Sequence, residues 1–178
     1  MTIREENPDD YETISLINDL AFSESNESAT PKSEESNIVD KLRQNRSILH
    51  SLVYEEKGKI LGHLMLSRGY IKNETQTIDV VALGPVAVHP KYQLQGIGKK
   101  LIEYGIEILK KEGEKIVILL GHTTYYPKFG FEPAISQEIF PSFNLASGHE
   151  DAFMVLFLDK RLKGVIHGKM EYDDAFGV

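Results

Sequence analysis

A strand–helix–strand unit between residues 80 and 120 constrains the fold of this 178-residue chain more than any other feature. An apolar run at 80–88 precedes a glycine-containing turn, a stretch with helical spacing over Ile97–Glu112, and the continuous apolar run Ile116–Leu120. A short run without polar positions is typical of a strand buried on both faces, and Gly113 is a natural helix end. The unit therefore predicts a fold in which strands and helices alternate.

The flanking segments predict further strands and two more helices. Thr2–Glu5 fits a short strand, the apolar runs at 48–54 and 60–66 are separated by the hairpin signal "EEKGK", and another run lies at 153–158. Asn7 and Pro8 suit the start of a helix, a second helix is expected near 38–42, and the polar residues 23–36 are expected to form a loop. These elements predict an α/β (α+β mixed) sheet with helices on both faces. We interpret His63, in the second run of the hairpin, as a structural strand residue.

Composition excludes several classes of protein. The hydrophobic content of 41% and charged content of 26% are ordinary for a soluble domain, and no apolar run approaches the roughly 20 residues that span a bilayer. The absence of Cys excludes disulfides, thiolate metal sites and a Cys nucleophile. The acidic N-terminus has no apolar segment typical of a secretory signal. We therefore expect a cytoplasmic protein that does not bind membranes, either a monomer or a homodimer.

The net charge of −7 is unevenly distributed. Residues 1–40 contain 11 Asp and Glu but only Arg4 and Lys32 as bases, whereas residues 41–178 carry 16 acids and 18 bases. This distribution argues against nucleic acid as a partner, because non-specific binding to nucleic acid needs a basic surface. Two interpretations of the acidic segment stay open: a solvated surface, or the border of a site that attracts cationic ligands.

The glycines at the junction between the strand and the helix suggest a phosphate-binding turn. Gly96 and Gly98 would let phosphate oxygens approach the free N–H groups at the positive end of the helix, and Lys91, Lys99 and Lys100 add positive charge. The alternative is a glycine-containing connection that serves only the turn. The spacing matches neither a P-loop nor a dinucleotide fingerprint, so neither ATP nor NAD is the expected ligand.

A proline in the preceding strand points to a more specific ligand. Pro85 has no N–H and therefore predicts a bulge or an opening in the sheet after Gly84. Beyond such an opening, the backbone groups of residues 86–88 would be free to pair with an extended ligand that carries amides. Coenzyme A combines a pantetheine, which has two amides, with a pyrophosphate. It would satisfy both the open strand and the phosphate-binding turn.

Two motifs resemble the GNAT family of N-acetyltransferases. "VALGPVAVHPKYQLQGIGKKLIEYG" is similar to the cofactor-binding segment of the family, Arg/Gln-x-x-Gly-x-Gly/Ala after a strand that ends in Val-x-Pro, and "YYPKFGF" is similar to the second signature. These two motifs most resemble the sequences of the YhbS-like branch of predicted acetyltransferases. The resemblance implies a GNAT domain over residues 1–160, with residues 161–178 as a C-terminal extension packed on it. It also implies a mostly antiparallel sheet that is splayed at a parallel strand pair.

The resemblance further implies acetyl transfer from acetyl-CoA to a primary amine by direct attack, without a metal. Tyr126 matches the general-acid position, although it could instead pack among aromatic neighbours. The residues expected to bind the cofactor through their backbone are Val86, Ala87 and Val88 at the pantetheine and Gln93, Leu94, Gln95, Gly96, Ile97, Gly98 and Lys99 at the pyrophosphate. The strand before the turn lacks the Glu that many relatives have. Asp79, His122 and a water chain therefore stay open as the general base.

The acceptor and the occurrence of turnover are also open. The resemblance implies a small-molecule or peptide amine, and the acidic first segment favours a cationic one. The alternative class is a non-catalytic acyl-CoA-binding or sensing module, which the missing strand Glu favours. A pure interaction domain is a third hypothesis.

Overall fold

The computed structural model describes residues 1–22 and 32–177, so most of the predicted loop at 23–36 lies outside the described residues. The chain divides into two compact units. Unit 1 contains Met1–Leu66 and Gly84–Ile108, and unit 2 contains Ser67–Leu83 and Leu109–Val178. In the described part of the chain, no helix is both long and apolar enough to cross a bilayer.

The helices and strands follow the predicted order with some additions. The helices are α1 (Tyr11–Phe22), α2 (Glu34–Asn45) and α3 (Ile97–Glu112). The strands are β1 (Thr2–Glu5), β2 (Ile48–Glu56), β3 (Lys59–Lys72), β4 (Thr77–Val88), β5 (Ile116–Leu120), β6 (Glu132–Pro133), β7 (Ile139–Pro141), β8 (Phe153–Phe157) and β9 (Gly168–Glu171). Three of these strands, β6, β7 and β9, were not predicted from the sequence.

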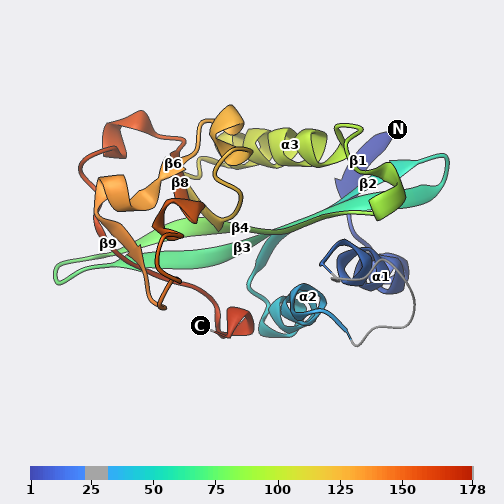
Figure 1. Ribbon diagram of the computed structural model, residues 1–178, viewed down its shortest axis with the longest axis horizontal. Coiled ribbons are helices and arrows are strands. Elements are labelled where there is room, and N and C mark those ends of the chain that lie inside the picture. The colour runs from blue at the N-terminus through green and yellow to red at the C-terminus, as the bar shows by residue number, and fades with distance from the viewer. Residues whose placement is uncertain (23–31, 178) are drawn as a thin grey trace. The chain divides into compact units, whose positions relative to one another are not determined.

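In unit 1, helices cover both faces of the sheet, as predicted (Figure 1). α3 packs on the face formed by Leu52, Leu64 and Leu66, because a Cβ added at Gly105 of α3 would lie 3.4–3.8 Å from these side chains. His63 points to the opposite face, where its ring contacts Asn18 of α1 at 3.3 Å. The alternation of side chains along β3 thus separates the two helical layers.

The start of the first helical segment is fixed by the residues predicted to fix it. The Asn7 side chain accepts a hydrogen bond from Asp9 N–H at 3.0 Å, and Asn7 N–H donates to the Asp10 carboxylate at 2.7 Å. This reciprocal cap, with Pro8 in the first turn, begins a 3₁₀ turn that continues into α1.

Unit 2 contains the predicted parallel strand pair. β4 and β5 are parallel at Val81↔Val117 and Ala82↔Ile118, and β5 pairs antiparallel with β8. β9 pairs antiparallel with the end of β3 and parallel with β7. Alternate residues of β5 and β8, with Ile139 and Met170, form a continuous buried core. The mixed sheet with a parallel pair confirms the predicted fold class.

Candidate functional site

The turn before α3 has a backbone suited to anion binding. Leu94 and Gly96 adopt left-handed conformations, with φ of 61° and 81°, and Leu94 is fully exposed. Lys100 N–H donates to Gly96 O at 3.0 Å and begins the helical ladder. The N–H groups of Ile97, Gly98 and Lys99 therefore precede the first helical bond, at the positive end of a 16-residue helix.

The surroundings of Gly96 explain the glycine. A Cβ at this position would meet no atom within 4 Å, so the positive φ, and not crowding, favours glycine. The open space also leaves the backbone accessible to a bulky anion. Gly58 in the turn between β2 and β3 and Gly113 after α3 share these two properties. The phosphate-binding interpretation therefore rests on the position of Gly96 immediately before the free N–H groups at the start of α3.

The end of β4 directs alternate backbone groups to opposite edges. His89 N–H donates to Leu61 O of β3 at 2.9 Å. The Ala87 carbonyl also faces β3, since its oxygen would lie 3.2 Å from a Cβ placed at Gly62. The backbone groups of Val86 and Val88 therefore face the opposite edge.

The opposite edge of β4 has no strand partner at residues 86–88 within the described chain. The paired register of β4 with β5 ends at Ala82↔Ile118, and the Gly84-Pro85 peptide bond that follows is cis. The Gln93 side chain donates to Val88 O at 3.1 Å and so ties the turn to the strand. Val86 and Val88 N–H are thus the backbone donors best placed for an extended ligand.

Tyr126 lies in unit 2, at the start of the 3₁₀ turn Tyr126–Phe129. Its ring meets those of Tyr125 and Phe131 edge-on, with centroids 5.3 and 5.9 Å away. The ring also lies against Gly121, where an added Cβ would be 2.8 Å from Cδ2, 3.2 Å from Cζ and closer still to Cε2. Gly121 is thus a neighbour of the candidate acid Tyr126 that was not singled out from the sequence. A Gly directly after a buried strand was the available signal.

Burial, with a smaller contribution from Tyr125, raises the pKa of Tyr126 to about 12. The phenol therefore remains protonated at neutral pH and acts as an O–H donor. A tyrosine with the ordinary pKa of about 10 is also protonated at neutral pH, so burial reinforces this state and does not create it. Packing among aromatic rings is therefore compatible with service as a proton donor.

The two candidate side-chain bases have different surroundings. The His122 carbonyl accepts hydrogen bonds from Tyr125 N–H at 3.1 Å and Tyr126 N–H at 3.4 Å, while the residue itself is exposed. Its backbone therefore shapes the tyrosine turn. Asp79 is exposed on β4 and contributes, after Glu114, to the raised pKa of Arg68. His122 and Tyr126 therefore both belong to unit 2, where the hydrogen bond from Tyr126 N–H joins them. Residues 86–88 and 93–99 belong to unit 1.

Comparison with known families gives a decisive match to these motifs. The model of the acetyltransferase (GNAT) domain matches residues 2–134, which include β4, the turn before α3, and Tyr126. The chain belongs to the GNAT family of acetyltransferases. The predicted family and the predicted enzyme class are therefore confirmed.

Named relatives support the YhbS-like branch. The chain is 36% identical to the uncharacterized N-acetyltransferase YjhQ of Escherichia coli K12 over 126 residues, 69% of this chain and 70% of YjhQ. It is 32% identical to the uncharacterized N-acetyltransferase YhbS of the same strain over 144 residues, 80% of this chain and 83% of YhbS.

Solved structures of GNAT proteins share the fold. The crystal structure of E. coli YhbS in complex with CoA matches with a TM-score of 0.85 and 28% identity, covering 99% of this chain and 92% of YhbS. A GNAT acetyltransferase from Brucella melitensis in complex with acetyl-CoA matches with a TM-score of 0.75 and 32% identity, covering 98% and 97% of the two chains.

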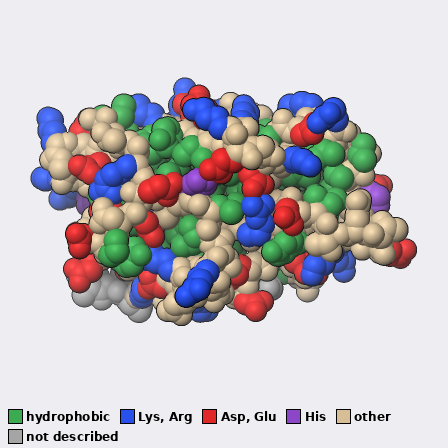
Figure 2. Space-filling view, turned by 180° about the vertical axis from the view of Figure 1, so that it is seen from behind, with side chains coloured by type: hydrophobic (Ala, Val, Ile, Leu, Met, Phe, Trp, Pro, Cys, Tyr) green, Lys and Arg blue, Asp and Glu red, His purple; other side chains and the backbone are tan. Residues whose placement is uncertain are grey.

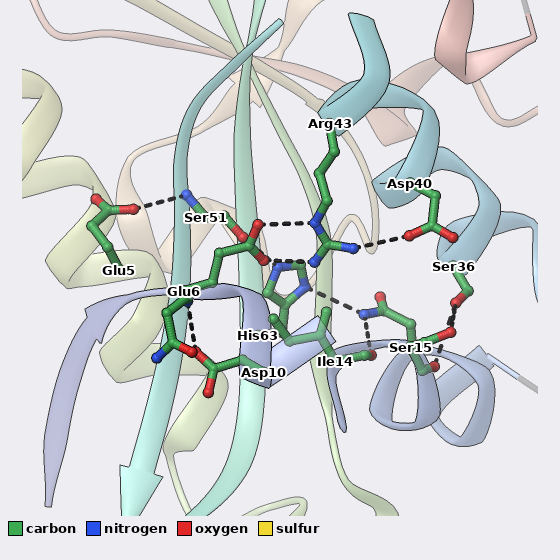
Figure 3. A network of polar contacts seen from close by, with 12 residues as sticks. Glu5, Glu6, Asp10, Ile14, Ser15, Ser36, Asp40, Arg43, Ser51 and His63 are labelled. Atoms are coloured by element: carbon green, nitrogen blue, oxygen red, sulfur yellow. Dashed lines mark hydrogen bonds and ion pairs between the residues drawn. The ribbon is translucent and has the colours of Figure 1, made fainter. Parts of the chain in front are cut away.

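The acidic first segment of this GNAT chain uses many of its carboxylates internally (Figure 3). Arg43 bridges Glu6 at 2.6 Å and Asp40 at 2.9 Å, and Arg4 binds Asp10 at 2.7 Å. Arg4 lowers the pKa of the Asp10 carboxyl through their hydrogen bonds. These pairs favour a structural interpretation of the acidic segment. The two acids at 24 and 27 lie outside the described residues.

His63 lies at the centre of the same network, as a structural residue should. It is fully buried, and its Nδ1 accepts from the Asn18 amide at 3.3 Å. Its Nε2 therefore carries the proton and donates to Ser51 Oγ at 3.0 Å.

On the molecular surface, Figure 2 shows acidic and basic side chains interspersed on the face it draws. Among the described residues, no group of three or more His, Asp or Glu is arranged to hold a metal ion.

Proposed function

We propose that this protein transfers the acetyl group of acetyl-CoA to a primary amine by direct attack. The observation that carries the proposal is the turn before α3, where left-handed Leu94 and Gly96 leave the first N–H groups of a long helix open to an anion. The complexes of YhbS with CoA and of the Brucella protein with acetyl-CoA support the same ligand.

The residues present fit acetyl-CoA at two places in unit 1. The N–H groups over residues 94–99 would bind the pyrophosphate, with Gly96 and Gly98 allowing close approach. Val86 and Val88 N–H would pair with the pantetheine amides and polarise the thioester carbonyl. Ala87 contributes its small buried side chain, and Gln93 holds the turn through Val88 O.

The chemistry then requires three proton and charge adjustments. A neutral amine attacks the thioester carbonyl, and backbone N–H groups stabilise the negative charge that develops on its oxygen. As the C–S bond breaks, the Tyr126 hydroxyl gives its proton to the departing CoA sulfur. Asp79, His122 or a water chain accepts the proton lost by the amine. The pH profiles of the activity of Asp79→Asn and His122→Gln distinguish these three proton acceptors.

The cofactor half of the proposal is tested by thermal shift. Acetyl-CoA and CoA should raise the melting temperature, whereas NAD and ATP at equal concentration should not. No shift at saturating acetyl-CoA would contradict both the enzyme and the sensor hypotheses.

Turnover is tested by thiol release in the presence of a panel of amines. Tyr126→Phe should lower kcat by about 10²- to 10⁴-fold while the affinity for acetyl-CoA is retained, because only the proton donor is removed. An unchanged kcat would show that another group protonates the sulfur.

A non-catalytic acyl-CoA sensor is the second candidate function. It is favoured by one observation, the absence of an acid from residues 80–88 of β4. A protein that is stabilised by acetyl-CoA but releases no thiol with any amine would support the sensor.

A further inference from the structure

Unit 2 contains a small apolar cavity that the proposed chemistry does not use. Its volume is about 240 Å³, and it is formed by residues between 135 and 153, after the end of the family-model match at residue 134. Its apolar wall consists of Ile135, Ile139, Phe140, Phe143, Leu145 and Phe153. Ile135 and Phe140 are 41% and 42% exposed, so the cavity is reached from solvent.

The cavity has room for a compact molecule. An apolar cavity of roughly 150 Å³ is enough to bind benzene. The 240 Å³ available here would hold an aromatic ring or a branched alkyl group with a few additional atoms. The three phenylalanine side chains supply the kind of wall that binds such a body.

The polar groups at the cavity favour a positive ligand. The polar part of the lining consists of the exposed residues Glu150 and Asn144, Pro141 is its remaining member, and the lining contains no Lys, Arg or His. Glu150 forms no ion pair within residues 1–22 and 32–177. A carboxylate without a protein cation, beside aromatic faces, attracts an ammonium group and repels an anion.

The register of β5 and β8 places this cavity on the opposite sheet face from Tyr126. Leu120 pairs with Phe153, so the cavity residue Phe153 shares a face with the even-numbered side chains of β5. Gly121, whose added Cβ would meet Tyr126, points to the other face. Leu156 on that other face lies 3.3 Å from a Cβ placed at Gly130, in agreement with this assignment.

We propose that this cavity is a binding site for a small primary ammonium compound with a compact apolar body. The apolar body would fill the space between the phenylalanines, and the ammonium would lie beside Glu150 and Asn144. This inference does not depend on acetyl-CoA binding or on the role of Tyr126.

The test is a titration of the full chain, without acetyl-CoA, followed by backbone amide chemical shifts. The probes are 2-phenylethylammonium, its neutral analogue 2-phenylethanol and the anion phenylacetate. We expect saturable shifts at residues 135–153, with a Kd for the ammonium of about 1 mM, as suits so few atoms. The neutral alcohol should bind more weakly, and phenylacetate weakest.

Matched variants assign the charge preference. Glu150→Gln should weaken binding of the ammonium about threefold to fivefold and leave the alcohol unchanged. Asp151→Asn, which removes the neighbouring exposed carboxylate, should change neither. Gly96→Asp should also leave the ammonium affinity unchanged, which separates this site from the proposed function.

Two results would overturn the proposal. One is the absence of saturable shifts at residues 135–153 with any probe. The other is equal affinity for the ammonium and the alcohol together with no effect of Glu150→Gln, which would leave an apolar cavity without preference for a cation.

Discussion

At the scale of single residues, Gly121 controls where the Tyr126 ring lies. The ring occupies the space that any larger side chain at 121 would need, and Gly121 N–H is held by Ala152 O at 2.9 Å. Because this hydrogen bond fixes the backbone at Gly121, a side chain at position 121 must displace the Tyr126 ring. Gly121 is therefore a positioning residue for the proposed acid.

Gly121→Ala should lower kcat about tenfold or more, because a displacement of about 1 Å is costly in an aligned site. Acetyl-CoA affinity should stay the same, so kcat and the binding constant are measured separately. In a Tyr126→Phe background the same substitution should cost little further activity, because the hydroxyl it displaces is already absent. Additive losses would contradict a positioning role.

His63 makes stability depend on pH. Burial, with a smaller contribution from Arg43, lowers the pKa of His63 to about 3, from 6.5. Below pH 6.5 the His63 imidazole of the unfolded chain binds a proton, whereas that of the folded chain stays neutral down to about pH 3. The free energy of unfolding therefore falls as pH falls, by up to about 1.4 kcal/mol per pH unit.

His63→Gln should remove this dependence between pH 7 and pH 5, a difference of about 2 kcal/mol in the change of unfolding free energy. Urea denaturation at the two pH values measures it. His122→Gln, which removes an exposed histidine, is the control and should retain the wild-type pH dependence. Equal dependence in both variants would show that His63 does not carry the effect.

At the scale of elements, the start of α3 is the part whose electrostatics can be tested most directly. Gly96 has a φ of 81°, a conformation that Asn and Asp tolerate better than other side chains. Asp and Asn are nearly the same size, so the pair isolates charge from shape.

Gly96→Asp should weaken acetyl-CoA binding about 10- to 100-fold relative to Gly96→Asn, because a carboxylate would face the pyrophosphate. Isothermal titration measures both affinities, and circular dichroism checks that both variants fold. If Asp and Asn weaken binding equally, steric exclusion and not charge explains the loss.

The same element was the most predictable from sequence. α3 begins after Gly96 and ends at Glu112, as the spacing and Gly113 indicated, and β5 matches its apolar run. β3 extends six residues beyond the predicted 60–66, because Ser67, Arg68 and Gly69 interrupt the apolar pattern but remain in the strand. β9 was missed because Gly168–Glu171 is short and polar, and only its partners β3 and β7 make it a strand.

At the scale of the whole molecule, the C-terminal segment is part of the core of unit 2. Met170 of β9 is fully buried, and Ile166 and Ala175 are nearly so. The sequence showed no role for this tail, because its pairing partners lie about 100 and 30 residues earlier in the chain.

Met170→Ala should lower the free energy of unfolding by about 2 to 5 kcal/mol, because it leaves a cavity in the core. Lys169→Ala, at the exposed neighbouring position in β9, should change it by about 0.5 kcal/mol or less. Chemical denaturation measures both. Similar small effects of both substitutions would contradict a role of Met170 in the core of unit 2.

The candidate site was predictable only where local motifs define it. The glycines at 96 and 98 and the "YYPKFGF" segment were sufficient to select the turn and Tyr126. Gly121 and the cavity beside Phe153 were not predictable, since both depend on which residues of β5 and β8 face the same side. The backbone groups of Val86 and Val88 face the opposite edge of β4 from those of Ala87. This difference likewise could be inferred only from the hydrogen bond between His89 and Leu61.

The register of β5 also limits how the length of this chain can vary. Adding or removing one residue between Ile116 and Leu120 would rotate every later side chain to the opposite face. Gly121 would then point toward the face of the sheet that contains Phe153. The Tyr126 ring would no longer lie against a residue without a side chain. Insertions and deletions should therefore be rejected within the five residues of β5, and also between Gly121 and Tyr126, where the ring must lie against the glycine.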